Sequence, residues 1–329
     1  MSEISPVSMH ALADASDAQF ASDVQYYLTL TPRQLPSRYF YDALGSALFD
    51  AICRLPWYRI TRAETRLLAA HGREIFDAFD RGVDTLVELG GGSGQKLMTL
   101  VEAGRSSLSR LELRLIDVSA SALASSARAL SVLDDVHIVT YEASYEAGLA
   151  EIKAARSGFG RTLTLFLGSN IGNFDPPGAE AFLRGIRAGL VRGDGFLLGA
   201  DLVKPERALL LAYDDPLGVT AAFNRNLLVR INRELGGDFD VNAFSHRAVW
   251  NARASRVEMH LVSRRRQCVR VPAATLEFDI EAGESIWTES SYKYEPHALR
   301  VMLERAGFRM MEQWIDGDEA FALTLVAAV

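Results

Sequence analysis

The sequence predicts an α/β fold, in which a doubly wound and mostly parallel sheet is accompanied by a smaller α+β domain. Three observations predict it. Short apolar runs alternate with helical patterns in the middle of the chain, an antiparallel hairpin follows near its end, and two flanking stretches break the alternation. Strands separated by helices form βαβ units, which favours a parallel sheet. Because the strands are almost continuously apolar, we expect both faces of the sheet to be covered.

Five apolar runs are the expected parallel strands: residues 84–89, 111–116, 136–141, 162–167 and 195–200. Helical patterns follow the first four strands, at residues 96–102, 120–133, about 145–155 and 178–190. A further helix is expected over residues 296–306, because Pro296 suits a first helical turn and Gly307 suits a helix stop.

Residues 309–315 and 320–328 are predicted to form a hairpin around a turn at residues 316–318, which places an antiparallel element at the sheet edge. A parallel sheet that ends in such a hairpin is typical of class I, Rossmann-like methyltransferases, whereas a standard dehydrogenase lacks the hairpin. We therefore expect a sheet domain of residues 63–201 and 293–329. The accessory domain would combine residues 1–62, mostly helical, with residues 202–292, where helix patterns precede strand patterns.

Composition excludes several classes of function. The formal net charge is −7 and Lys and Arg form no block, which argues against a nucleic-acid partner. No apolar run reaches the length of a membrane span, and the N-terminal residues lack the pattern of a secretory signal. Cys53 and Cys268 form neither a C-x-x-C pair nor a disulfide framework, so the cytoplasm is the expected location. The six histidines show no metal-type spacing, and no metal site is predicted.

Residues 88–94 read E-L-G-G-G-S-G, between an expected strand and an expected helix. Gly90, Gly92 and Gly94 allow a sharp turn and a close approach to a ligand, and Glu88 precedes the turn. A dinucleotide fingerprint needs glycine where the chain has Gln95. The motif therefore predicts binding of S-adenosyl-L-methionine, which has no pyrophosphate for the turn to hold.

Four further residues are candidate cofactor ligands. Asp117 ends the second strand, where an acid accepts ribose hydroxyls, although it is also suited to cap the next helix. Lys96, in the first turn after the glycine motif, suits the cofactor carboxylate, with a solvated surface lysine as the alternative. Ser144 and Tyr145 follow the third strand, where many such enzymes hold the adenine amine with an acid.

Longer motifs resemble the histidine-specific Nα-methyltransferases of ergothioneine biosynthesis. They extend over nearly the whole chain, and comprise F-Y-D-A-L-G-S-x-L-F-D (40–50), L-P-x-Y-x-x-T-R-x-E (55–64), F-L-G-S-N-I-G-N (166–173), D-L-V-K (201–204), A-Y-D-D-x-x-G-V-T-A-A-F-N-R-N (212–226) and T-E-S-S-Y-K (288–293). The resemblance implies trimethylation of the α-amino group of L-histidine to the betaine hercynine, the first step of ergothioneine biosynthesis.

The resemblance also implies a histidine pocket between the two domains. Asn173 and Tyr213 would meet the substrate carboxylate, and Glu289 and Ser291 would hold the imidazole. The amine and ring sides would be lined by Tyr41, Tyr58, Gly168 and Met259. Asn170 departs from the small hydroxyl residue usual in the family, and Ser144 departs from the usual acid.

Six of these residues also have a structural interpretation. Asn173 would cap the turn before Pro176 and Pro177, and Glu289 would be a solvated acid. The three tyrosines would be core aromatics with a wet hydroxyl, and Met259 would fill the core.

The chemistry needs a neutral amine held in line with the cofactor methyl, and no dedicated base is evident. A proton would leave through water, aided by Tyr41 or Tyr58. Three other functions stay open at this stage: methylation of another amino acid or amine, an NAD-linked oxidoreductase, and an inactive scaffold. We expect a monomer that acts on a small molecule.

Overall fold

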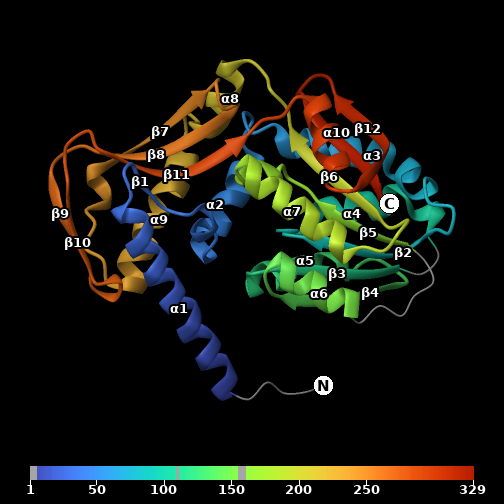
Figure 1. Cartoon of the computed structure of the whole chain (residues 1–329), viewed down its shortest axis with the longest axis horizontal. Helices are drawn as coiled ribbons and strands as arrows, with labels where there is room; N and C mark the ends of the chain where they lie inside the picture. Colours follow the sequence, from blue (N-terminus) through green and yellow to red (C-terminus); the bar gives the residue numbers. More distant parts are fainter. Residues whose placement is uncertain (1–5, 109–110, 155–160) are drawn as a thin grey trace. The chain divides into compact units, whose positions relative to one another are not determined.

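The computed structural model describes residues 6–108, 111–154 and 161–329, with side chains described from residue 18 onward (Figure 1). The chain divides into two compact units. The core unit comprises Tyr58–Glu206, Ala252–Arg256 and Ser291–Val329, and the accessory unit comprises Met1–Trp57, Arg207–Asn251 and Val257–Ser290. The first helix of the core unit begins at Ile60 and belongs wholly to that unit, and Ala252–Arg256, inside the expected accessory range, also groups with the core unit.

A seven-stranded sheet forms the centre of the core unit, in the order β12-β13-β6-β5-β2-β3-β4. Its strands are β2 (Val83–Leu89), β3 (Leu111–Asp117), β4 (Val136–Glu142), β5 (Arg161–Phe166), β6 (Gly195–Asp201), β12 (Phe308–Asp316) and β13 (Phe321–Ala328). The strands from β6 to β4 are parallel, whereas β13 runs antiparallel to both β6 and β12. The predicted fold class is therefore confirmed, with β12 at the edge and β13 inside the sheet.

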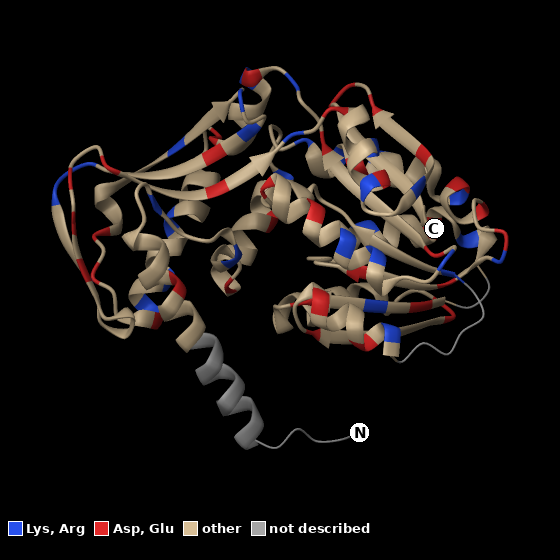
Figure 2. Ribbon diagram, viewed as in Figure 1, with Lys and Arg blue, Asp and Glu red and all other residues tan. Residues whose placement is uncertain are grey.

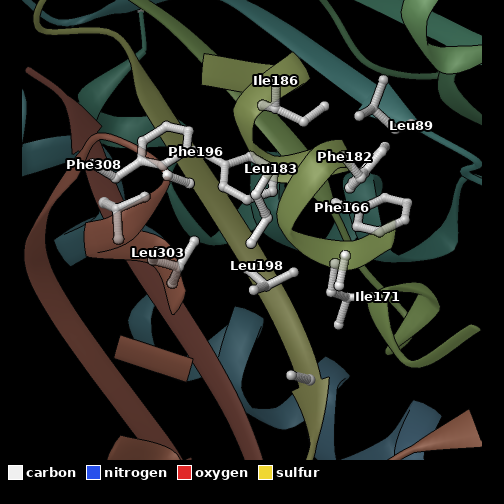
Figure 3. Close-up of a cluster of buried hydrophobic side chains, with 14 of the residues drawn as sticks. Leu89, Phe166, Ile171, Phe182, Leu183, Ile186, Phe196, Leu198, Leu303 and Phe308 are labelled. Atoms are coloured by element: carbon white, nitrogen blue, oxygen red, sulfur yellow. The ribbon is translucent and has the colours of Figure 1, made fainter. Parts of the chain in front are cut away.

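Helices cover both faces of this sheet. They are α3 (Ile60–Asp77), α4 (Gln95–Ala103), α5 (Ala120–Leu130), α6 (Tyr145–Ala154), α7 (Pro176–Gly189) and α10 (Pro296–Arg305), with short 3-10 turns η2 (Arg105–Ser107) and η3 (Asn170–Asn173). One buried cluster joins α6, α7 and α10 to the sheet, and Figure 3 shows Phe166, Phe182, Phe196 and Phe308 within it. On the opposite face, α3 contacts α4 and the hairpin strands, while α5 contacts β3 and β4. Every residue of β6 and β13 is buried, as expected for a sheet covered on both faces.

Two helix limits differ from the expected ones for local reasons. α7 begins at Pro176 because the Asp175 carboxylate accepts from the Gly178 amide at 2.9 Å, and proline suits the first turn that this cap creates. α5 ends at Leu130, because Ser131 closes the last turn onto the Ala127 carbonyl at 3.0 Å. The expected start at residue 178 and end at residue 133 were therefore wrong by two or three residues.

The accessory unit combines helices with a second sheet, as its helix and strand patterns predict. Its four-stranded sheet has the order β1-β11-β8-β7, and β9 pairs with β10. The strands are β1 (Arg33–Gln34), β7 (Phe244–Asn251), β8 (Arg256–Ser263), β9 (Gln267–Val271), β10 (Leu276–Ile280) and β11 (Ser285–Tyr292). The helices are α1 (Pro6–Thr29), η1 (Ser37–Phe40), α2 (Ala43–Arg54), α8 (Glu206–Tyr213), α9 (Val219–Leu235), η4 (Val241–Ala243) and η5 (Pro272–Ala274).

Among the described N-terminal residues, the helices α1, η1 and α2 are accompanied by β1, which pairs in parallel with β11 through Arg33 and Gln34. Charged side chains of both signs are interspersed along the elements of each unit (Figure 2). Many of them form ion pairs within one unit, for example Arg233 with Asp42 at 2.6 Å and Arg66 with Asp316 at 2.8 Å. In the part of the chain that the structure describes, no helix is both long and apolar enough to cross a bilayer.

Candidate active site

The predicted cofactor residues of the core unit follow neighbouring parallel strands at one edge of the sheet. Glu88 stands near the end of β2, and Asp117 ends β3. The register pairs Leu89 with Ile116 and Asp117 with Glu142, so the ends of β2, β3 and β4 lie at the same level. Open α/β sheets bind ligands at this carboxyl edge. The fold thus brings the predicted cofactor residues together.

The glycine-rich turn forms a cradle that a side chain would fill. Gly90 has a φ of 70°, and its amide donates to the Ile116 carbonyl at 2.9 Å. A Cβ on Gly90 would lie 2.5 Å from the Tyr145 hydroxyl oxygen. Gly94 also has a left-handed φ, of 72°, at the start of α4, and no side chain caps this helix. A Cβ on Gly92 would meet no other atom within 4 Å, so the turn has room for a ligand beside the uncapped start of α4.

Glu88 is a buried carboxylate that faces this turn. Its Oε2 has no hydrogen-bond partner among the described residues, and a Cβ on Gly91 would lie 2.2 Å from that oxygen. Burial raises its pKa to about 7, against an opposing effect of the Lys96 charge, and Glu64 and Asp117 raise it further. A ligand with a positive charge and N–H donors would satisfy this oxygen.

Asp117 is half-buried, and burial raises its pKa although backbone amides of Ser119 and Val118 oppose the shift. Its Oδ1 accepts from the Ser119 amide at 2.9 Å. The helix-cap interpretation of Asp117 is wrong, because Ser119 is the N-cap of α5 and its hydroxyl accepts from the Ala122 amide. The carboxylate is therefore available for more than local structure.

Ser144 and Tyr145 begin α6 and differ in role. The Ser144 hydroxyl accepts from the Ala147 amide at 3.3 Å, as a capping side chain does. Tyr145 packs its ring edge-on against Phe166 at 5.6 Å, and burial raises the pKa of its hydroxyl. Its hydroxyl reaches Gly90, so Tyr145 lies directly beside the glycine-rich turn.

Lys96 is not a solvated surface lysine, because its ammonium forms an ion pair with Glu64 at 2.5 Å. Glu64 is completely buried, and both of its oxygens accept from the Gly168 amide, at 2.8 and 2.9 Å. A Cβ on Gly168 would lie 3.0 Å from Lys96 Nζ. Sequence reasoning missed Glu64, whose only signal was its place at the end of the L-P-x-Y-x-x-T-R-x-E motif.

The loop after β5 holds Asn170 and Asn173 at the two ends of η3. Asn173 does not cap the following helix, because Asp175 does. A Cβ on Gly172 would lie 2.7 Å from the Tyr292 carbonyl and 3.4 Å from the Ser291 hydroxyl. The structure therefore brings the segment of Asn173 next to Ser291, which is buried.

Tyr213 and Met259 lie in the accessory unit, where both are buried. The Tyr213 carbonyl accepts from His246 Nε2 at 2.8 Å, and His246 Nδ1 lies 2.8 Å from Asn224 Nδ2. An amide nitrogen only donates, so the Nε2 tautomer of His246 is assigned from this network. Burial lowers the pKa of His246, which keeps the ring neutral. His246 is therefore a structural histidine of the accessory unit.

Asn224 also connects to the strands that carry Met259 and Glu289. Its Oδ1 accepts from the Thr288 hydroxyl at 2.7 Å, and that hydroxyl oxygen lies 3.0 Å from the Met259 carbonyl. Glu289 follows Thr288 in β11 and is half-buried, unlike a fully solvated acid. One polar network therefore fixes the backbone at Tyr213, Met259 and Thr288.

Of the two predicted catalytic tyrosines, Tyr58 belongs to the core unit and is buried. Tyr41 belongs to the accessory unit and is half-buried, with ring-edge contacts to Phe49 at 5.6 Å and Phe223 at 5.8 Å. Both tyrosines thus have packed rings.

These residues fit S-adenosylmethionine. The unpartnered Glu88 oxygen suits a cationic group with N–H donors, Asp117 suits ribose hydroxyls, and the glycine turn leaves the space that the ligand needs. The sheet, with its antiparallel β13 and this edge, defines a class I, S-adenosylmethionine-dependent methyltransferase.

A family model described as histidine-specific methyltransferase, SAM-dependent, matches residues 20–328, so the chain belongs to this family. A histidine N-alpha-methyltransferase of Mycobacterium tuberculosis is 44% identical over 98% of both chains. A protein of the same name from Mycolicibacterium smegmatis is 43% identical, over 95% of this chain and 96% of the relative. Ergothioneine biosynthesis protein 1 of Neurospora crassa is 27% identical, over 90% of this chain and 33% of the relative.

Proposed function

We propose that this protein transfers methyl groups from S-adenosylmethionine to the α-amino nitrogen of L-histidine, up to the trimethylated betaine that opens ergothioneine biosynthesis. The observation that supports it best is the retention of both halves of the machinery. The core unit has an intact glycine turn with Glu88 and Asp117, and the chain keeps the motif residues for a histidine substrate.

When bound, S-adenosylmethionine supplies an electrophilic methyl group on its sulfonium. Glu88 and Asp117 would hold its amino and ribose groups, and Lys96 its carboxylate. Gly90, Gly92 and Gly94 leave the backbone open to it, and Ser144 with Tyr145 would contact the adenine. These residues bind and orient the cofactor. Correct orientation of two reactants lowers the activation free energy by up to roughly 7–11 kcal/mol.

The substrate ligands are those of the family motifs. Asn173 and Tyr213 donate to the histidine carboxylate, Glu289 accepts from a ring N–H, and Ser291 contacts the other ring nitrogen. Gly168, Asn170 and Met259 line the remaining surface. A charge-assisted hydrogen bond of about 1.5–3 kcal/mol discriminates against an amino acid without ring nitrogens by about ten- to a hundredfold.

The amine must lose its proton before it accepts a methyl group. An α-amino pKa of about 8 makes this step cost about 1.4 kcal/mol near neutral pH. The proton leaves through water, aided by Tyr41 or Tyr58. The reaction stops after three methyl groups, because the betaine nitrogen has no lone pair.

The test is incubation of the purified chain with L-histidine and S-adenosylmethionine, followed by mass spectrometry. Mono-, di- and trimethylated histidine are expected in succession, and the Asp117→Asn variant should form them more slowly. A chain that binds adenosylhomocysteine but leaves histidine unmodified, while it methylates another amino acid, would disprove the substrate assignment alone.

We also propose that the protein is a monomer that acts in the cytoplasm. Sedimentation and cell fractionation test these two statements independently of the activity.

A further inference from the structure

Glu64 is a buried carboxylate of α3 that joins two parts of the candidate active site. It is completely buried, and it closes the L-P-x-Y-x-x-T-R-x-E motif without a role among the predicted ligands. Both of its oxygens accept from the Gly168 amide, and Oε2 also pairs with the Lys96 ammonium. Gly168 is a predicted substrate residue and Lys96 a predicted cofactor residue. All three belong to the core unit, so one carboxylate of that unit contacts a residue of each kind.

The central sheet provides the space for this carboxylate. Gly199 lies inside β6, every residue of which is buried, and a Cβ on Gly199 would lie 1.9 Å from Glu64 Oε1. The absence of a side chain at this position therefore lets a charged group approach the sheet. A buried ion pair adds little stability in comparison with apolar residues of similar volume. Packing alone thus does not account for a glutamate here, whereas its two polar partners do.

The Gly168 amide is held in one direction by this contact. Its nitrogen lies 2.8 Å from Glu64 Oε1 and 2.9 Å from Oε2, so the N–H points between the two oxygens. Because a peptide group is planar, the direction of this N–H also sets the orientation of the peptide that joins Leu167 to Gly168. Gly168 has a left-handed φ of 78° in the loop between β5 and η3. The carboxylate therefore fixes the start of the loop that carries Asn170 and Asn173.

Lys96 brings the same carboxylate into contact with the cofactor side. Its Nζ lies 2.5 Å from Glu64 Oε2, and a Cβ on Gly168 would lie 3.0 Å from that nitrogen. The charges of Lys96 and Glu64 also shift the pKa of Glu88 in opposite directions, so the pair lies close to the glycine-rich turn. A ligand carboxylate at Lys96 would take up part of the positive charge that acts on Glu64. Glu64 would then be a stronger acceptor for the Gly168 amide.

We propose that Glu64 is a positioning residue that couples cofactor binding at Lys96 to histidine binding at the loop of Gly168. A cofactor carboxylate on Lys96 strengthens the contact of Glu64 with the loop, and the ordered loop binds histidine more tightly. Because coupling between two ligands is reciprocal, histidine raises the affinity for the cofactor by the same factor. This inference rests on the proposed function, and it assigns to Glu64 a role that is exerted through Lys96 and Gly168.

The experiment measures the dissociation constant of L-histidine by calorimetry, first without a second ligand and then at saturating adenosylhomocysteine. The ratio of the two constants is the coupling factor, which should be about fivefold or more in the wild type. The decarboxylated analogue of adenosylhomocysteine lacks the group that would meet Lys96, so the factor should fall close to one with this ligand. A factor close to one with adenosylhomocysteine itself, or equal factors for the two ligands, would overturn the proposal.

Glu64→Gln keeps the volume of the side chain but removes its charge. Its amide nitrogen would replace one of the two oxygens that accept from Gly168, and the coupling factor should fall close to one. Glu74→Gln, at an exposed position of the same helix, is the matched control and should keep the wild-type factor. An unchanged factor in Glu64→Gln would contradict the proposal, because a residue with a purely structural role leaves this ratio unchanged.

If Glu64→Gln does not fold, as judged by its melting curve, Gly199→Ala decides. Its Cβ would displace the carboxylate without removing the charge, so the coupling factor should again fall, and a wild-type factor in this variant would also overturn the proposal. If neither variant folds, the comparison of the two ligands on the wild type decides. Failure of the wild type to bind and methylate histidine would instead disprove the proposed function.

Discussion

His246 Nε2 lies 2.8 Å from the carbonyl oxygen of Tyr213, and this bond ties a predicted substrate ligand to a buried, neutral imidazole. The other ring nitrogen is occupied by Asn224, which in turn meets Thr288 next to Glu289. Protonation of the ring would turn Nδ1 from an acceptor into a second donor that faces the Asn224 amide. The charge of this ring therefore affects the polar network of the accessory unit.

We expect a pH-dependent stability from this histidine. Its folded pKa is lowered, so its contribution is present above the unfolded pKa of about 6.5 and is lost as the pH falls below it. His246→Phe should reduce the loss of stability at acidic pH. It should also lower the free energy of unfolding at neutral pH by about 1–3 kcal/mol, because Tyr213 and Asn224 lose partners. Urea unfolding at several pH values measures both. The exposed His297→Phe is the control, and an identical pH slope in wild type and His246→Phe would contradict the assignment.

Glu88 should show a trade-off between stability and binding. Its folded pKa of about 7 lies above the ordinary glutamate value of 4.5, so its ionisation reduces stability as the pH rises between these values. Glu88→Gln should therefore raise the free energy of unfolding of the ligand-free chain by up to about 3 kcal/mol at pH 8. It should also weaken binding of adenosylhomocysteine at least about tenfold. Calorimetry measures the binding of adenosylhomocysteine and urea unfolding measures the stability, with Glu142→Gln, at an exposed position, as control.

Gly90 should tolerate no side chain. Gly90→Ala would place a Cβ against the Tyr145 hydroxyl at a left-handed φ, whereas Gly82 has a similar φ of 68° with open space around it. Gly82→Ala should lower the free energy of unfolding only by the cost of backbone strain, about 1–2 kcal/mol. Gly90→Ala should lose more, and should lose affinity for adenosylhomocysteine. Tyr145→Phe in the same chain removes the clashing oxygen, and thermal melting should show partial recovery; no recovery would place the clash elsewhere.

The Glu64–Lys96 pair should respond asymmetrically to mutation. Glu64 is fully buried and Lys96 is 22% exposed, so removal of the lysine leaves the more costly unpaired charge. Lys96→Met should destabilise the fold by about 3–5 kcal/mol, and Glu64→Gln by less, with strong non-additivity in the double variant. Lys153→Met, an exposed lysine of α6, should have little effect. Additive losses in urea unfolding would show that the pair is not coupled.

The sheet was predictable because each of its strands is recognisable from a short, contiguous sequence pattern. Apolar runs such as β2 and β5 are bounded by glycine or polar residues, and the structure shifts their ends by one residue or so. Helix limits were less predictable where a cap decides them, as Asp175 does for α7. Strand β1 could not be predicted, because its two residues become a strand only by pairing with β11, far away in sequence.

The site divides in the same way. Glu88, Asp117 and the glycines were found because the motif is contiguous and follows a strand. Glu64 and Lys293 lie within quoted motifs and His246 lies outside them, but none of the three received a role, because each acts through partners distant in sequence, such as Gly168 for Glu64 and Asp201 for Lys293. Residues that hold ligands in place are recognisable only once the fold has brought their partners together.

The location of β13 has a consequence for biosynthesis. Its partner β6 is synthesised before the accessory segment that follows it, and β13 is translated only after that segment. Until β13 pairs with it, β6 has an unpaired, apolar edge that is exposed, although every residue of β6 is buried in the folded sheet. A truncated polypeptide that lacks Phe321–Ala328 should therefore be insoluble. The nascent chain should need chaperones most late in its synthesis rather than at the start.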